Sequence, residues 1–344
     1  MLNMDAVGLG KTLQAVGAIA VYAWLVNLTM TIPEQGGEGQ LPGMFANSTE
    51  WWLTALNNGT LARPHIIVVP VSLVDQIVVE LHSVGGVRPV EQPPHKRIMV
   101  VSHPTLGNTG KVVLTNTHNT PSKVPELRMG VQAEQQAAQT VFGRQWGVAV
   151  IDEIHQCRNV GQFFMGVTAL TSMSIGVLGM SATPVSSKAM DLWNIGRALR
   201  INFFISNDAE ARDMNRAQTR GLRKDRKKRA VDPESVTNVL RGADTDMVSE
   251  VSKEMAPYVA QMRDHFSGLV IRRTIASVDW EGKPLLTLRP YTEHIFTMRL
   301  YQHEYDALEA LLACDAPAAC PRLSPAISFQ SANRPSLSDF EYGA

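Results

Sequence analysis

The sequence predicts an α/β protein with a parallel sheet flanked by helices. Short runs of β-branched and other apolar residues alternate with segments of helical pattern, as they do in parallel α/β folds. Hydrophobic residues make up 44% of the 344 residues and charged residues 19%, which is enough for a core in one large or two ordinary domains. A glycine-containing loop directly precedes the first long apolar segment, where phosphate-binding proteins start a helix.

The elements follow in order from these patterns. Residues 1–4 can form only a short strand, and residues 13–28 are almost wholly apolar and predict a buried helix. Further strands are predicted at 65–70, 97–102, 146–151 and 175–180, and further helices at 72–82, 130–142, 162–173 and 188–199. Residues 29–62 and 104–128 are rich in turn-forming residues, so we expect insertions there, the first with one short helix and the second as a mobile loop.

The composition changes after residue 205. Residues 206–267 predict a basic helical protrusion, made of a helix over 206–230 and a second over 245–266 that is interrupted near Pro257. A strand-like return at 268–274 follows, and then an extended stretch at 293–300 and a helix at 301–313. The tail is rich in Ala, Pro and Ser and predicts disorder. The expected units are therefore 1–205, 206–267, 268–313 and 314–344.

Overall charge, cysteines and histidines exclude several classes of function. Lys and Arg total 32, as do Asp and Glu, so a nucleic-acid surface must come from local clustering. Three cysteines without close spacing argue against a disulfide framework or a zinc site and fit a reducing compartment. Apart from His155, the histidines show no ligand spacing. The apolar stretch 13–28 is too short to span a membrane comfortably, so we expect no membrane partner.

The stretch D-A-V-G-L-G-K-T, which begins at Asp5, ends like a phosphate-binding loop. Gly8 and Gly10 permit backbone geometry in which N–H groups surround a phosphate at a helix N-terminus. Lys11 would reach the β- and γ-phosphates, and the Thr12 hydroxyl would bind Mg²⁺. Asp5 stands where the general pattern has its first glycine. The alternative is a glycine-containing turn before an ordinary helix.

An acidic pair follows the strand predicted at 146–151. Asp152 comes directly after its apolar residues, at a strand end where phosphate-loop enzymes place a carboxylate that holds Mg²⁺. Glu153 is then placed to orient or deprotonate an attacking water. A solvated acidic turn is the alternative interpretation of the pair.

Motifs in the same order resemble those of the Swi/Snf-type chromatin-remodelling ATPases, which are superfamily-two helicase-like proteins. The loop is similar to the family's D-E-M-G-L-G-K-T. D-E-I-H-Q-C-R-N at 152–159 is similar to D-E-A-H-R-I-K-N, and A-T-P-V-S-S-K-A-M-D-L-W at 182–193 resembles G-T-P-L-Q-N-N-L-x-E-L-W. V-V-P-V-S-L at 68–73 resembles V-x-P-x-S-L, and I-R-R-T at 271–274 resembles L-R-R-T.

The resemblance implies a RecA-like P-loop NTPase lobe that hydrolyses ATP during movement along double-stranded DNA. It implies that ATP phosphates are bound by Gly8, Leu9, Gly10, Lys11 and Thr12. Thr12 and Asp152 would hold Mg²⁺, and Glu153, Lys11 and Asp152 would carry catalysis. His155, Ser181 and Thr183 would couple the ATP site to DNA contacts. The cofactors implied are ATP and Mg²⁺.

The basic stretch 212–229 lies where the resembling family has a helical protrusion. Many of its Lys and Arg residues recur at four-residue spacing, so a helix would carry them as a stripe. The predicted nucleic-acid contacts are Arg216, Arg220, Lys224 and Lys228. A solvated linker or a localisation signal is the alternative.

The sequence therefore predicts the N-terminal, ATP-binding lobe of a DNA-dependent ATPase. About 70 residues (344 minus 274) follow Thr274, too few for a second lobe of roughly 150 residues, so we expect a fragment with weak activity alone. Expected partners are double-stranded or nucleosomal DNA and a second helicase lobe or remodeller subunits, in a nuclear or otherwise intracellular, soluble protein. The alternatives are an inert nucleotide-binding or interaction module left by truncation, and an RNA-directed superfamily-two helicase.

Overall fold

The protein is described by a computed structural model. The described residues are 1–5, 10–34, 40–85, 92–183, 188–231, 250–274, 276–278, 281–284, 301–304 and 306. The chain divides into two units, Met1–Thr287 and Leu288–Ala344, and the described elements of the fold lie in the first. The predictions for 293–300 and for the tail 314–344 fall outside the described residues, as does most of the helix predicted at 301–313.

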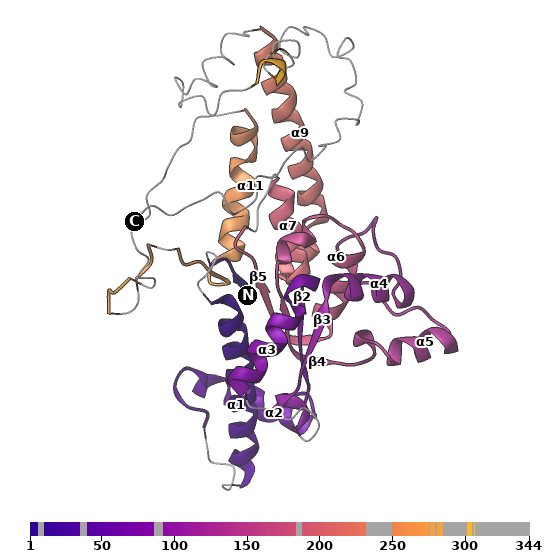
Figure 1. Cartoon of the computed structure of the whole chain (residues 1–344), viewed down its shortest axis with the longest axis vertical. Helices are drawn as coiled ribbons and strands as arrows, with labels where there is room; N and C mark the ends of the chain where they lie inside the picture. The colour runs from indigo at the N-terminus through magenta and orange to yellow at the C-terminus, as the bar shows by residue number, and fades with distance from the viewer. Residues whose placement is uncertain are drawn as a thin grey trace, which may run out of the picture. The chain divides into compact units, whose positions relative to one another are not determined.

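A sheet of six parallel strands forms the centre of the first unit, in the order β3-β2-β4-β5-β1-β6 (Figure 1). The strands are β1 (Leu2–Asn3), β2 (His65–Val69), β3 (Ile98–Ser102), β4 (Trp146–Ile151), β5 (Ser174–Met180) and β6 (Val270–Ile271). Every residue of β2 and β4 is buried, as expected of parallel strands covered on both faces. The predicted α/β class, with a parallel sheet flanked by helices, is confirmed.

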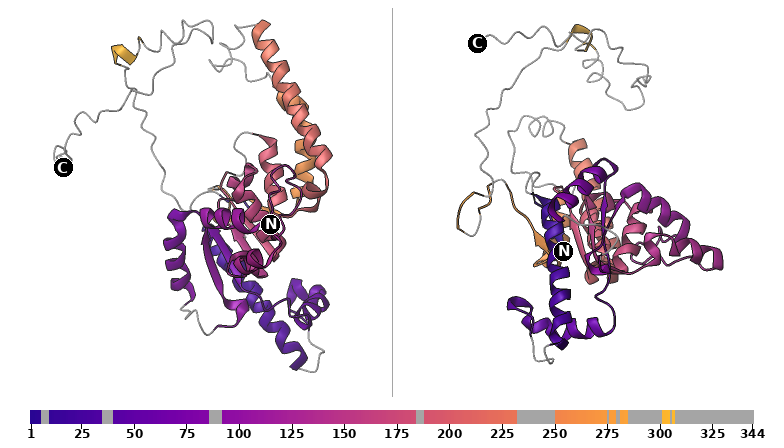
Figure 2. Two further views of the ribbon diagram at one scale, coloured as in Figure 1. Left: turned by 90° about the vertical axis from the view of Figure 1, so that its right-hand side faces the viewer. Right: turned by 60° about the horizontal axis from the view of Figure 1, so that its bottom comes forward.

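Helices cover both faces of this sheet (Figure 2). Alternate residues of a strand point to opposite faces of a sheet. In β4, Val148 and Val150 belong to one buried cluster, and Ala149 and Ile151 belong to the other. The first cluster includes α1 (Lys11–Glu34), α2 (Thr49–Asn57) and α3 (Val74–Gly85). The second includes α4 (His103–Val113), α6 (Gln162–Ser172), α7 (Ala189–Ala198) and α8 (Asn202–Ser206). Helix α5 (Val131–Ala138) and the short helix Val141–Gly143 occupy the region of the helix predicted at 130–142.

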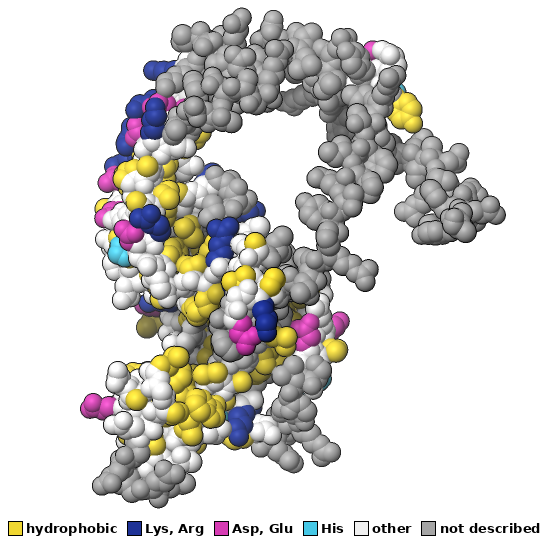
Figure 3. All heavy atoms as spheres, turned by 90° about the vertical axis from the view of Figure 1, so that its left-hand side faces the viewer, with side chains coloured by type: hydrophobic (Ala, Val, Ile, Leu, Met, Phe, Trp, Pro, Cys, Tyr) yellow, Lys and Arg dark blue, Asp and Glu magenta, His cyan; other side chains and the backbone are white. Residues whose placement is uncertain are grey.

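Helix α1 is longer than predicted and is buried on one face only. It runs from Lys11 to Glu34, so the insertion expected from residue 29 begins after the helix and contains both a 3-10 helix (Gly43–Ser48) and α2. Its opposite face exposes Leu13, Val21 and Trp24, and hydrophobic side chains gather there in Figure 3. Among the described residues, it is the one helix long and apolar enough to cross a membrane by length and composition, a property that core helices share.

The prediction of a loop over 104–128 is wrong for the first part of this range, because helix α4 occupies residues 103–113. Ser102 caps this helix by accepting a hydrogen bond from a backbone N–H of the first turn. Gly107, which suggested a turn, lies where α6 approaches: a Cβ on it would stand 3.4 Å from the backbone nitrogen of Phe163. Gly107 therefore lies at the contact between α4 and α6 and not in a turn.

The predicted basic protrusion consists of two long helices that lie side by side, α9 (Asp208–Val231) and α11 (Glu250–Phe266) (Figures 1 and 2). The interruption expected at Pro257 is wrong, because α11 continues through it. The Asp225 carboxylate accepts the backbone N–H of Glu250 at 2.8 Å and so caps the start of α11. Gly221 allows the contact between the two helices, since a Cβ there would lie 2.6 Å from the Cα of Val251.

Substituting Gly221 with alanine is therefore expected to destabilise the protein by about 1–3 kcal/mol, because the added methyl group forces two backbones apart. Chemical denaturation of the full chain measures the free energy of unfolding. Gly17→Ala is the matched control: Gly17 lies in helix α1, and a Cβ there meets nothing within 4 Å. We expect the control to be neutral or slightly stabilising. Equal stability of Gly221→Ala and the parent would contradict the close packing.

Candidate functional site

The predicted site residues lie at neighbouring strand ends. Because all strands are parallel, their carboxyl ends share one edge of the sheet, where ligands of α/β proteins bind. Along this edge β4, β5, β1 and β6 are neighbours. They are followed, in this order, by Asp152, Ser181, the loop that leads to Lys11, and Arg273.

Asp152 supplies a nearly buried carboxylate, with 8% of the residue exposed. Burial, together with the neighbouring charge of Glu153, raises the pKa of Asp152 to about 6, while the positive charge of Lys11 acts in the opposite direction. Lys11 is thus close enough to influence Asp152 electrostatically. A carboxylate that has lost hydration gains from a cation, so the residue fits the predicted role of holding Mg²⁺.

The same edge offers few protein ligands for a metal. Among the described residues, no group of three or more His, Cys, Asp or Glu side chains is arranged to hold an ion. Mg²⁺ in phosphate-transfer sites is commonly held by one or two carboxylates plus waters and substrate phosphates, which is the donor set that Asp152 and the Thr12 hydroxyl would supply. Thr12 is half-buried in the first turn of α1.

Glu153, directly after Asp152, contacts residues that follow it along the same edge of the sheet. It has a left-handed backbone (φ 48°), a conformation that costs an L-residue about 1–2 kcal/mol and turns the chain sharply after Asp152. His155 Nδ1 lies 2.9 Å from Glu153 Oε2 and 3.1 Å from the hydroxyl oxygen of Ser181. The backbone N–H of Thr183 donates to the same hydroxyl at 3.2 Å. The structure therefore brings these residues together, and their coupling role stays a prediction.

His103 also belongs to this edge, although no sequence motif assigns it a role. Its Nε2 lies 2.9 Å from the carbonyl oxygen of Asp152, and its Nδ1 lies 3.0 Å from Gln156 Oε1. The ring packs on Phe163 with centroids 4.4 Å apart. Burial lowers the pKa of His103, which favours a neutral ring that donates to the Asp152 carbonyl. The signal available in the sequence was its position directly after a predicted strand.

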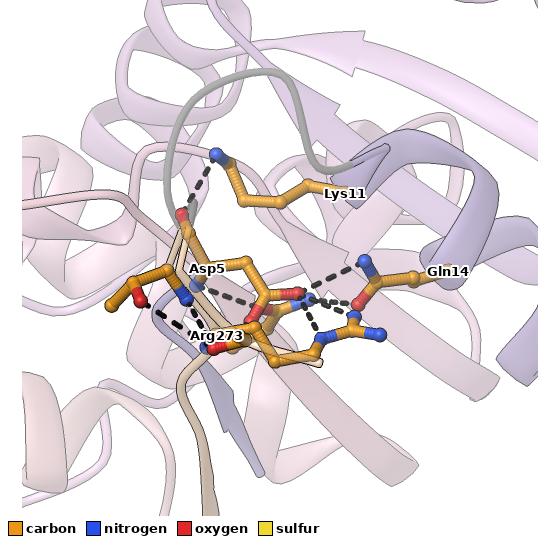
Figure 4. Close-up of polar contacts among 7 residues, drawn as sticks. Asp5, Lys11, Gln14 and Arg273 are labelled. Carbon is orange, nitrogen blue, oxygen red and sulfur yellow. Dashed lines mark hydrogen bonds and ion pairs between the residues drawn. The ribbon is translucent and has the colours of Figure 1, made fainter. Parts of the chain in front are cut away.

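The phosphate-binding loop is described at its two flanks, while residues 6–9, which include Gly8 and Leu9, lie outside the described residues. Gly10 has φ 69°, so a glycine is favoured there, as the loop motif predicts. Lys11 Nζ donates to the carbonyl oxygen of Asp5 at 3.1 Å (Figure 4).

Asp5 is fully buried and is held by hydrogen bonds from both ends of the fold (Figure 4). The backbone N–H of Arg273 donates to Asp5 Oδ1 at 2.7 Å, and Arg273 Nε donates to Oδ2 at 3.0 Å. Gln14 Nε2 donates to Oδ2 at 3.0 Å. Burial alone would raise the pKa of Asp5, but these hydrogen bonds outweigh it and lower the pKa. In the sequence, Asp5 stood out only as a departure from a glycine, and its pairing with Arg273 was missed.

The basic stripe on α9 is partly neutralised by acidic neighbours. Glu254 on α11 accepts from Lys224 at 2.6 Å and lies 3.5 Å from Arg220, and Asp213 pairs with Arg216 at 3.1 Å. In Figure 3, Lys and Arg side chains alternate with Asp and Glu along this helical pair. The side chain of Lys228 lies outside the described residues. An open groove of about 540 Å³ runs along the stripe, lined by Asn215, Arg216, Thr219, Arg220 and Arg223.

Comparison with known proteins finds one matching family model. The model is described as an SNF2-related domain and matches residues 2–317. Among solved structures, the chain is similar to one described as the Sulfolobus solfataricus SWI2/SNF2 ATPase core in complex with double-stranded DNA, with 15% sequence identity and a TM-score of 0.40. That alignment covers 80% of this chain and 40% of the other. No curated protein matches the chain.

Proposed function

Because the chain belongs to the SNF2-related family of ATPases, we propose that it is the ATP-binding lobe of a DNA-dependent ATPase. The observation that carries the proposal is that Asp152 and Glu153 after β4, and the loop after β1 that leads to Lys11, lie along one edge of the sheet, where the charge of Lys11 acts on Asp152. A cation at a helix N-terminus beside a buried carboxylate is what a nucleotide with its metal ion requires.

Each residue of the site has a task in this proposal. The N-terminus of α1 and the Lys11 ammonium would bind the phosphates, and Thr12 with Asp152 would hold Mg²⁺, which when bound neutralises phosphate charge. Glu153 accepts the proton of the attacking water as its oxygen bonds to the γ-phosphorus and the bond to the β–γ bridging oxygen breaks, giving ADP and phosphate. His155, at 2.9 Å from Glu153 Oε2, orients that carboxylate.

Nucleotide binding and turnover test the proposal. Calorimetry should detect binding of Mg·ATP to the full chain, and a steady-state assay should show ATP hydrolysis that duplex DNA stimulates. Failure to bind Mg·ATP would favour an inert interaction module. Stimulation by RNA in place of DNA would favour the RNA-directed helicase.

The stripe on α9 is proposed to bind DNA phosphates without sequence preference. Replacing its basic residues with serine should weaken duplex binding and flatten its salt dependence, since each lost phosphate contact lowers the slope of log affinity against log salt by about 0.9. The residues to replace are Arg223, Lys224, Arg226, Lys227, Lys228 and Arg229. Fluorescence titrations at several salt concentrations measure the slope, and an unchanged slope would mean that the stripe is only a solvated surface.

Glu254 offers the matched variant of opposite sign. Glu254 forms ion pairs with Arg220 and Lys224. Glu254→Gln removes the negative charge from both pairs, so both cations can bind phosphates and DNA binding should become tighter. Arg220 and Lys224 are exposed, so their ion pairs with the half-buried Glu254 contribute little to stability and the fold should tolerate the change.

A further inference from the structure

The two flanks of the phosphate-binding loop are joined by side-chain hydrogen bonds. Asn3 Oδ1 accepts the backbone N–H of Asp5 at 3.0 Å, and Asn3 Nδ2 donates to Gln14 Oε1 at 2.7 Å. Gln14 Nε2 in turn donates to the Asp5 carboxylate at 3.0 Å. Asn3 and Asp5 precede the loop and Gln14 follows it, so this cluster sets the distance that the loop must span.

Arg273 joins the cluster from a segment 268 residues away in sequence. Strand β6 pairs with β1 in parallel, and the Met4 N–H donates to the Ile271 carbonyl at 2.7 Å, which delivers Arg273 to Asp5. The guanidinium then meets one carboxylate oxygen through both Nε and Nη2, while its own backbone N–H binds the other oxygen. Such a planar, charge-assisted contact fixes orientation as well as distance.

We propose that Arg273 is a positioning residue of the ATP site, which acts through Asp5 and does not touch the nucleotide; this rests on the function proposed above. The Asp5 carboxylate is fully buried, so its charge needs a cation. Lys11 already donates to the Asp5 carbonyl oxygen at 3.1 Å and is within reach of that residue. Arg273 thereby balances the charge of the carboxylate, so that this charge does not fall to Lys11.

This assignment predicts a particular pattern of nucleotide affinity. In Arg273→Met the buried carboxylate keeps its hydrogen bonds from Gln14 and from the backbone N–H of residue 273 but loses its cationic partner. It then competes with phosphate for Lys11, so Mg·ATP affinity should fall by about tenfold or more. Adding Asp5→Asn removes the competing charge, so the double variant should bind Mg·ATP more tightly than Arg273→Met alone. Arg272→Met is the matched control, because Arg272 is the exposed neighbour on the same segment, and it should bind like the parent.

Isothermal calorimetry with Mg·ATP on the full-length variants, with thermal melting run alongside, tests the inference. Parental affinity of Arg273→Met overturns it, and so does a double variant that binds no more tightly than the single one. If Arg273→Met does not fold, Arg273→Lys is the test, because it keeps the positive charge and loses the planar guanidinium. Reduced affinity at the parental melting temperature supports the proposal, whereas parental affinity overturns it. A parent that does not bind Mg·ATP contradicts the proposed function instead, so the two failures are distinguishable.

Discussion

Replacing Lys11 with alanine is expected to weaken Mg·ATP binding by about a hundredfold, because a charge-assisted contact to the phosphates is lost. The structure adds a second contribution. Lys11 opposes the rise in the pKa of Asp152, which stands at about 6, so its removal raises that pKa further. Mg²⁺ needs the ionised carboxylate, and the loss of affinity should therefore be larger at pH 6 than at pH 8.

Calorimetric titration at both pH values measures this effect. Lys111→Ala is the control, since Lys111 is an exposed lysine on α4. Equal affinity of Lys11→Ala and the parent would show that the loop does not bind phosphate through this residue. A loss of affinity that is the same at both pH values would show that Lys11 and Asp152 act independently.

The second large effect separates binding from chemistry at Glu153. Glu153→Gln keeps the shape of the side chain and an acceptor oxygen for His155, which lies 2.9 Å from Oε2 in the parent. It removes the group that accepts the proton of water, so ATP hydrolysis should fall by about a hundredfold to ten-thousandfold. Mg·ATP binding should persist.

A steady-state phosphate-release assay at saturating ATP, with duplex DNA present, compares this variant with the parent. Glu134→Gln, on the exposed surface of α5, controls for the loss of a negative charge. Hydrolysis by Glu153→Gln at the parental rate would mean that Glu153 is not the group that activates water.

The sheet could be predicted because its strands are short apolar runs, and such runs between helical segments are typical of buried parallel strands. Helix α4 could not, since Gly107 and Gly110 indicate a turn when only local propensity is considered. In the fold, both glycines lie where α6 approaches α4, and that packing outweighs their low helix propensity. The interruption predicted at Pro257 in α11 was wrong for the same reason, because packing against α9 maintains a helix that the local sequence disfavours.

The candidate site was predictable where its residues follow strands directly. Asp152 and Ser181 could be placed at one edge because parallel strands end together. The Asp5–Arg273 pair could not, because spacing along a chain carries no information about a pairing 268 residues apart. His103 was missed because a single histidine shows no ligand spacing, and its contact with the Asp152 carbonyl depends on the order of the strands.

Strand β1 has only two residues, and both of its partners are made much later by the ribosome: Leu2 pairs with Gly179 on one side and with Val270 on the other. Contacts of such long sequence separation form slowly in any folding reaction. At synthesis rates of roughly 5–20 residues per second, about 15–50 seconds pass between the first strand and β6. Throughout that interval β1 lacks its second neighbouring strand, and the buried Asp5 carboxylate that follows it lacks the guanidinium of Arg273. Among the described strands, the edge that carries the proposed nucleotide site is thus the last to be completed during biosynthesis, and a nascent chain would gain the full stabilisation of ATP binding only after Arg273 has emerged.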